Sequence, residues 1–71
     1  MIDEHLQSLV EALLKLEDKR SRCWDALGDA SRKYNFEKAT NLRKVLRSLD
    51  RIIWGLRVEI SILNTRTARA H

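Results

Sequence analysis

Apolar residues recur at alternating steps of four and three along nearly the whole chain, in two separate runs. The first run comprises Ile2, Leu6, Leu9, Leu13, Leu16, Arg20, Cys23, Leu27, Ala30 and Tyr34. The second comprises Ala39, Leu42, Leu46, Leu49, Ile53, Leu56, Ile60, Leu63 and Thr67. This spacing aligns side chains along one side of a helix. The sequence therefore predicts an all-α protein with two long helices, each carrying one seam.

The break between the two runs is short and carries the signals of a helix start. Asn35 is a favourable N-cap, because its side-chain oxygen can accept a hydrogen bond from an unpaired amide of the next turn. Glu37 then lies near the positive end of the helix dipole. A connection this short favours an antiparallel αα-hairpin. We expect one domain over residues 1–71, with helices at about 3–33 and 36–66, a turn at about 34–35 and a tail at 67–71.

Folding the chain about residues 34 and 35 brings the two seams into register. The opposed pairs are Ala30 with Ala39, Leu27 with Leu42, Cys23 with Leu46, Leu16 with Ile53, Leu13 with Leu56, Leu9 with Ile60 and Leu6 with Leu63. The same fold brings Asp3 near Arg66 and Glu11 near Arg57, so the acidic start of the chain meets its basic end. Such surface pairs add little energy but favour the antiparallel register.

A chain of 71 residues has a small core and usually needs a disulfide, a metal or association to be stable. The single cysteine, Cys23, cannot form an internal disulfide, and no Cys/His set has metal-ligand spacing. A second stripe lies next to each seam and needs a further surface to cover it. We therefore expect a homodimer forming a four-helix bundle, with an interface that comprises Val10, Leu14, Trp24, Val45, Ser48, Ile52, Gly55 and Ile62.

Gly28 leaves a second architecture open. If Gly28 ended the first helix and Asp29 capped a short middle one, the chain would form three helices. A glycine inside a helix costs only about 1 kcal/mol relative to alanine. Leu27 and Ala30 keep the heptad phase across Gly28. We therefore expect the first helix to be continuous, with or without a bend at this glycine.

The segment from Asp29 to Asp50 resembles the UVR motif of bacterial excision-repair subunits and related proteins. The matching residues are Ala30, Phe36, Glu37, Ala39, Leu42, Arg43, Leu46 and Leu49. The match covers about 22 of the 71 residues, and Lys44 stands where the family usually has an acidic residue. The resemblance implies a helical hairpin used for protein–protein docking, often by pairing with another hairpin. It implies no catalytic chemistry.

One face of the second helix combines basic side chains with an aromatic ring. Its residues are Arg43, Arg47, Arg51, Trp54 and Arg57. This face could follow nucleic-acid phosphates while Trp54 stacks on a base. It could also be a protein-binding hot spot, where Trp and Arg are enriched, or a solvated face with local ion pairs.

Two seam positions depart from the apolar pattern. Arg20 lies beside Asp50, so the two side chains could form a buried pair that fixes the register, or the Arg20 stem could line the core while its head reaches water. Cys23 is expected to pack as a small apolar residue.

No constellation of catalytic residues or phosphate-binding loop is visible, so we expect a non-enzymatic protein without cofactor or metal. The sequence lacks a signal-peptide pattern and any long uncharged apolar run, which predicts a cytoplasmic protein that does not bind membranes. The preferred hypothesis is an adaptor, assembly factor or inhibitor that binds a larger protein. The alternative is a basic accessory protein that binds nucleic acid, consistent with a net charge of +4.

Overall fold

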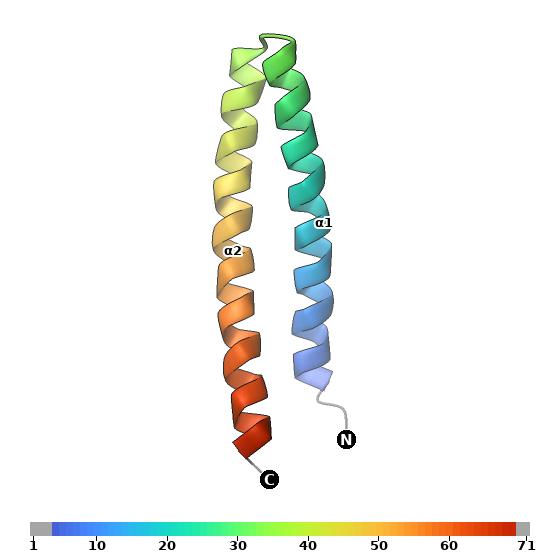
Figure 1. The fold of residues 1–71 in the computed structure, drawn as a ribbon, viewed down its shortest axis with the longest axis vertical. Helices are drawn as coiled ribbons and strands as arrows, with labels where there is room; N and C mark the ends of the chain where they lie inside the picture. Colours follow the sequence, from blue (N-terminus) through green and yellow to red (C-terminus); the bar gives the residue numbers. More distant parts are fainter. Residues whose placement is uncertain (1–3, 70–71) are drawn as a thin grey trace.

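Two antiparallel α-helices form a rod in the computed structural model, which describes residues 4–69 and the side chains of residues 4–66. Helix α1 spans Glu4–Arg32 and helix α2 spans Phe36–Arg69. Figure 1 shows them side by side along their whole length, with the turn at one pole and both helix ends at the other. The rod measures 55 × 16 × 13 Å. The all-α class and the two-helix arrangement are thereby confirmed.

The helix boundaries differ slightly from those predicted. Helix α2 continues to Arg69, so residues 67–69 of the predicted tail are helical. Residues 3, 70 and 71 lie outside the described part. The turn comprises residues 33–35, one residue longer than expected.

The turn closes with two backbone hydrogen bonds that satisfy the last carbonyls of α1. The amide of Asn35 donates to the carbonyl of Ala30 at 2.9 Å, and the amide of Tyr34 donates to that of Ser31 at 3.2 Å. This pair of bonds defines a Schellman motif. Tyr34 holds the left-handed position of the motif with φ 57°. The seam therefore ends at Ala30, and Tyr34, which was expected to continue it, is 78% exposed in the turn.

The predicted cap of the second helix is confirmed. The amide of Lys38 donates to the side-chain oxygen of Asn35 at 3.2 Å. Glu37 lies in the first turn of α2, where its charge complements the helix dipole. Asn35 thus closes α1 with its amide and starts α2 with its side chain.

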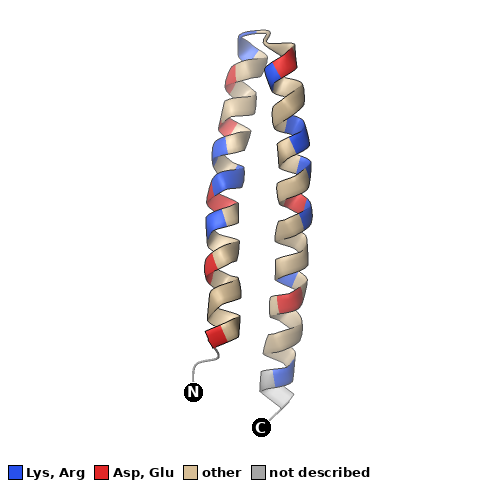
Figure 2. Ribbon diagram, turned by 180° about the vertical axis from the view of Figure 1, so that it is seen from behind, with Lys and Arg blue, Asp and Glu red and all other residues tan. Residues whose placement is uncertain are grey.

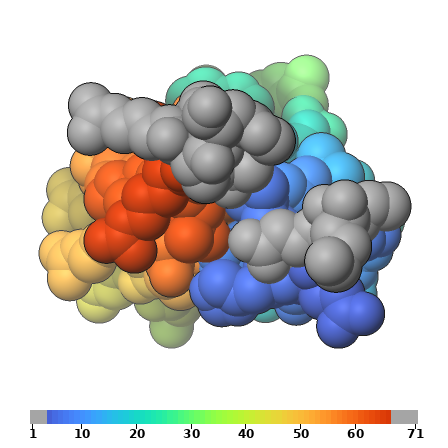
Figure 3. All heavy atoms as spheres, turned by 90° about the horizontal axis from the view of Figure 1, so that it is seen from below, coloured from blue at the N-terminus to red at the C-terminus, as the bar shows by residue number. Residues whose placement is uncertain are grey.

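The core consists of the two predicted seams. Among the residues whose side chains the structure describes, six hydrophobic residues are buried and all of them are seam residues, namely Cys23, Ala30, Ala39, Leu46, Leu49 and Ile53. Leu13, Leu16, Leu27 and Leu42 pack against them. Seen from the open end in Figure 3, the blue N-terminal atoms of α1 and the orange C-terminal atoms of α2 lie in direct contact. Burial is greatest between the turn and the middle of the rod, while the seam side chains nearest the open end are only half-buried.

Helix α1 passes through Gly28 without interruption. The three-helix architecture is therefore contradicted. A methyl group added at Gly28 would meet no atom within 4 Å, so packing does not require glycine at this position.

Candidate interaction surface

One ion pair and one histidine–carboxylate contact between the helices mark the two flanks of the seam. On one flank, Nη2 of Arg57 lies 2.7 Å from Oε1 of Glu17. On the other, Nε2 of His5 lies 3.8 Å from Oε1 of Glu59. Glu17 and Arg57 each directly follow a seam residue, whereas His5 and Glu59 each directly precede one. Because the helices are antiparallel, the residues that directly follow a seam residue in the sequence lie on one side of the molecule in both helices. We call this side the groove flank. The residues that directly precede a seam residue share the opposite side, which we call the stripe flank.

The expected pairing of Glu11 with Arg57 is wrong. Glu11 instead accepts a hydrogen bond from Nε2 of Gln7 at 3.5 Å within α1. Glu11 lies two positions after the seam residue Leu9 and therefore points outward, beyond reach of α2. The other expected charge contact involves Asp3, which lies outside the described residues.

Arg20 and Asp50 form the ion pair that their positions predicted, from Nε to a carboxylate oxygen. Their side chains are 43% and 53% exposed, so the pair lies at the surface and is not buried. Arg20 stands on the seam, and its guanidinium reaches the groove flank. Half-exposed ion pairs of this kind contribute at most about 1 kcal/mol.

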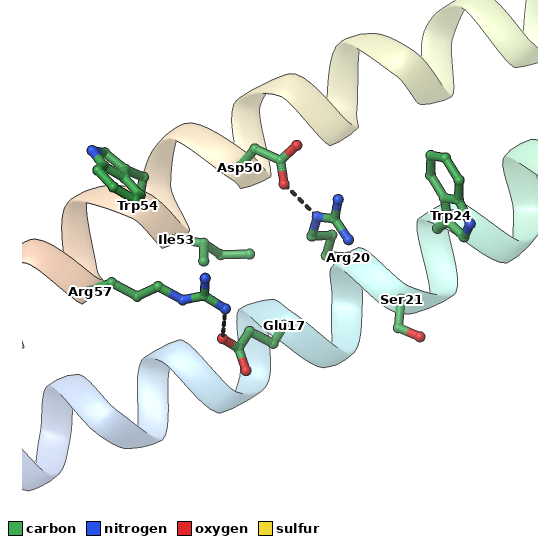
Figure 4. A pocket seen from close by; sticks show the side chains of 8 residues that line it. All are labelled: Glu17, Arg20, Ser21, Trp24, Asp50, Ile53, Trp54 and Arg57. Carbon is green, nitrogen blue, oxygen red and sulfur yellow. Dashed lines mark hydrogen bonds and ion pairs between the residues drawn. The ribbon is translucent and has the colours of Figure 1, made fainter.

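The groove flank contains two adjoining hollows that share Arg20, Trp24 and Asp50; we call them together the Trp/Arg groove. The first also involves Glu17, Ser21, Ile53, Trp54 and Arg57. The second also involves Leu27, Gly28, Ser31, Arg43, Leu46 and Arg47. Figure 4 shows Trp24 and Trp54 on either side of the Arg20–Asp50 pair, with Trp24 coming from α1 and Trp54 from α2. Trp24 and Trp54 are 59% and 69% exposed.

The arginines of the predicted basic face fall into three groups. Arg57 is neutralised by Glu17 at the first hollow. Arg43 and Arg47 line the second hollow, and within residues 4–66 neither forms a salt bridge. Arg51 lines neither hollow. Figure 2 shows how basic residues outnumber acidic ones along α2. The unneutralised positive charge of the groove therefore comes from Arg43 and Arg47.

The residues expected to form one dimer interface lie on two different flanks. Val10 lies seven residues before Glu17 and Trp24 lies seven residues after it, so each directly follows a seam residue, as Glu17 does. Leu14 lies next to them on the helix surface, and this stripe of α1 therefore belongs to the groove flank. The residues from α2 belong to the stripe flank; they are Val45, Ser48, Ile52, Gly55 and Ile62 and we call them the α2 stripe. All eight residues are exposed. They therefore cannot form one continuous surface on a single hairpin.

Sequence reasoning missed the groove and an aromatic pair at the turn. Glu17 and Ser21 received no role from the sequence alone, although the antiparallel pairing places them at the same hollow as Arg57 and Trp54. Tyr34 and Phe36 are 78% and 74% exposed, and their rings meet edge to face with centroids 6.5 Å apart. The aromatic residues on both sides of Asn35 were the available signal.

Cys23, the remaining candidate residue, is part of the packed core. Cys23 is buried in the core, and its thiol donates to the carbonyl of Leu42 at 3.5 Å. Over the described residues, no group of three or more His, Cys, Asp and Glu side chains is placed to hold a metal ion. In the same part of the chain, neither helix has a stretch long and apolar enough to cross a membrane.

The surface and the fold define a two-helix hairpin with one amphipathic groove and one apolar stripe. Comparison with protein-family models, with curated proteins and with solved structures finds no match.

Proposed function

We propose that this chain is a non-enzymatic protein–protein interaction module. It acts as an adaptor, an assembly factor or an inhibitor of a larger cytoplasmic protein, and its hairpins associate into a four-helix bundle. The observation that carries the proposal is the Trp/Arg groove. There two exposed indoles lie beside two arginines that form no salt bridge with any side chain of residues 4–66.

The composition of the groove suits a protein partner. Trp and Arg are the residues most enriched at binding hot spots, because each combines a large apolar area with directional hydrogen bonding. A complementary surface would present an aliphatic or aromatic side chain to Trp24 and Trp54. It would also present carboxylates to Arg43 and Arg47. The resemblance of residues 29–50 to the UVR motif points to the same class of function.

Self-association is supported by the surface of the single hairpin. The chain exposes 5987 Å², whereas a compact monomer of 8.3 kDa exposes about 4,600 Å². Its radius of gyration is 16.3 Å, against about 11 Å for a compact domain of this length. A rod with this much exposed surface gains from a second copy that covers its apolar residues.

The proposal is tested by capture from the native host. Immobilised wild-type chain is compared with a Trp24→Ser, Arg47→Glu variant, and with Arg51→Glu as the matched control that lies outside the groove. We expect a specific protein to be retained by the wild type and the control and lost from the groove variant. Identical retention by all three would contradict the proposal.

Arg43 and Arg47 beside Trp24 favour nucleic-acid binding as the second candidate function. The Glu17–Arg57 and Arg20–Asp50 ion pairs oppose it, because among the described residues they leave only Arg43 and Arg47 as unpaired cations in the groove. Titration against labelled single- and double-stranded oligonucleotides at near-physiological salt decides between the two candidates. Binding that is lost in an Arg47→Glu, Arg51→Glu variant supports this candidate, and no binding at tens of micromolar protein removes it.

A further inference from the structure

The α2 stripe contains three large apolar side chains that the described part of the hairpin leaves about half exposed. Val45, Ile52 and Ile62 are 43%, 50% and 48% exposed. The corresponding positions of α1 on this flank include Lys15, Lys19 and Arg22, all exposed. The apolar surface of the stripe flank therefore belongs to α2.

We propose that α2 packs antiparallel against α2 of a second copy, with the two-fold axis beside Ile52. This inference rests on the self-association proposed above and specifies which surface carries it and in which direction the copies run. A two-fold contact must be complementary to itself, because the same patch serves both copies.

The centre of the α2 stripe has this self-complementary pattern. Ile52 has Ser48 about one turn before it and Gly55 about one turn after it. Around a two-fold axis beside Ile52, Ser48 of one copy faces Gly55 of the other. A methyl group at Gly55 would meet no atom within 4 Å in the single hairpin, so the space above it is open. Small residues at a crossing let two helices approach closely, and Ile52 of each copy then fills the space beside Ser48 and Gly55 of the other.

The distribution of charge selects the antiparallel direction. The half of the rod nearest the turn, residues 19–51, contains ten basic and four acidic residues and has a net charge of +6. In the open half, residues 4–18 and 52–66 contain three basic and five acidic residues and have a net charge of −2. An antiparallel dimer places the turn half of each copy against the open half of the other. A parallel dimer would bring the two positive halves together, which Coulomb repulsion disfavours.

Disulfide trapping tests the arrangement, with every chain carrying Cys23→Ala so that the introduced thiol is the only one. A Ser48→Cys chain mixed with a Gly55→Cys chain should give at least about tenfold more mixed disulfide than either same-variant disulfide, because only the mixed pair comes within bridging distance. Ile52→Cys should form a disulfide dimer, and Leu14→Cys on the groove flank should not. Ser48→Cys chains that couple mainly to one another would show a parallel dimer and overturn the proposal.

The second measurement is sedimentation equilibrium of two variants, each of which replaces one glycine by leucine. Gly55→Leu should raise the dimer dissociation constant at least about tenfold, because its side chain occupies the crossing. Gly28→Leu makes the same change in equally open space on the groove flank and should leave the constant unchanged. Equal effects would overturn the proposed crossing. A dimer that forms without these disulfides refutes the arrangement and leaves the interaction module standing, whereas a monomer at high micromolar concentration refutes self-association as well.

Discussion

At the scale of single residues, the turn contains a left-handed backbone conformation that is usually occupied by glycine at the C-terminal end of a helix. Tyr34 is the only non-glycine residue with positive φ in the described part of the chain. The left-handed region costs an L-residue about 1–2 kcal/mol, because its Cβ approaches the following carbonyl oxygen. The two hydrogen bonds of the Schellman motif hold the residue there. The hairpin therefore stores local backbone strain at Tyr34, a residue whose side chain is 78% exposed.

This strain predicts a reversal of the usual order of alanine and glycine in and around helices. Tyr34→Gly should have a free energy of unfolding about 1 kcal/mol higher than Tyr34→Ala. Both variants remove the ring contact with Phe36, so the difference between them isolates the backbone. Urea unfolding followed by circular dichroism measures it. Equal stability of the two variants would show that Tyr34 is unstrained.

Arg20 is the residue that interrupts an otherwise apolar seam. Its charge is matched by Asp50 at the surface, so the pair contributes little stability while it occupies a position that a leucine would fill. We expect Arg20 to set the register at a small energetic cost.

Replacement of this residue is expected to stabilise the hairpin. Arg20→Leu should raise the free energy of unfolding by about 1 kcal/mol, because the leucine buries apolar surface against the seam and Asp50 stays solvated. Arg22→Leu serves as the control, since Arg22 lies outside the seam with its side chain 80% exposed and should change stability by less than about 0.5 kcal/mol. Thermal unfolding of both variants tests this. A loss of stability in Arg20→Leu would mean that the ion pair outweighs packing.

At the scale of the helices, the heptad pattern predicted the architecture because each helix buries only one line of side chains. The seam residues, the cap at Asn35 and the continuity of α1 all follow from local spacing, and the structure confirms them. The groove did not follow from spacing within one helix. Its formation depends on which flank of α1 meets which flank of α2, and the antiparallel direction sets this. Trp24 therefore lies near Arg47 and Trp54, on the opposite side from Ile52.

The continuity of α1 leads to a prediction at Gly28. Gly28→Ala should raise the free energy of unfolding by about 1 kcal/mol, because alanine has the higher helix propensity and its methyl group meets no atom within 4 Å. Chemical denaturation with matched far-ultraviolet spectra provides the measurement. Reduced helicity in this variant would indicate that α1 bends or breaks at Gly28 in solution.

At the scale of the whole molecule, the hairpin is a rod with too little core to be strongly stable alone. Within residues 4–66, only six hydrophobic side chains are buried, and all lie in the two facing seams. Its stability should therefore depend on association, which links the folding equilibrium to protein concentration.

The concentration dependence is directly measurable. A hundredfold increase in protein concentration should raise the Tm by about 5 °C or more, because dimerisation draws the folding equilibrium toward the native state. Ile52→Glu should abolish this dependence, while Leu14→Glu, which adds the same charge on the groove flank, should retain it. A wild-type Tm that is independent of concentration would contradict the dimer.

The uneven burial along the seam also determines how the rod yields to force. Both helix ends lie at the pole where the seam side chains are only half-buried, and the tightly packed layers lie toward the turn. Tension applied between the two ends would unzip the hairpin layer by layer, from its weakest layers toward its strongest. Tension applied between one end and the turn would shear many layers at once, so the same molecule should open easily in one pulling direction and resist in the other.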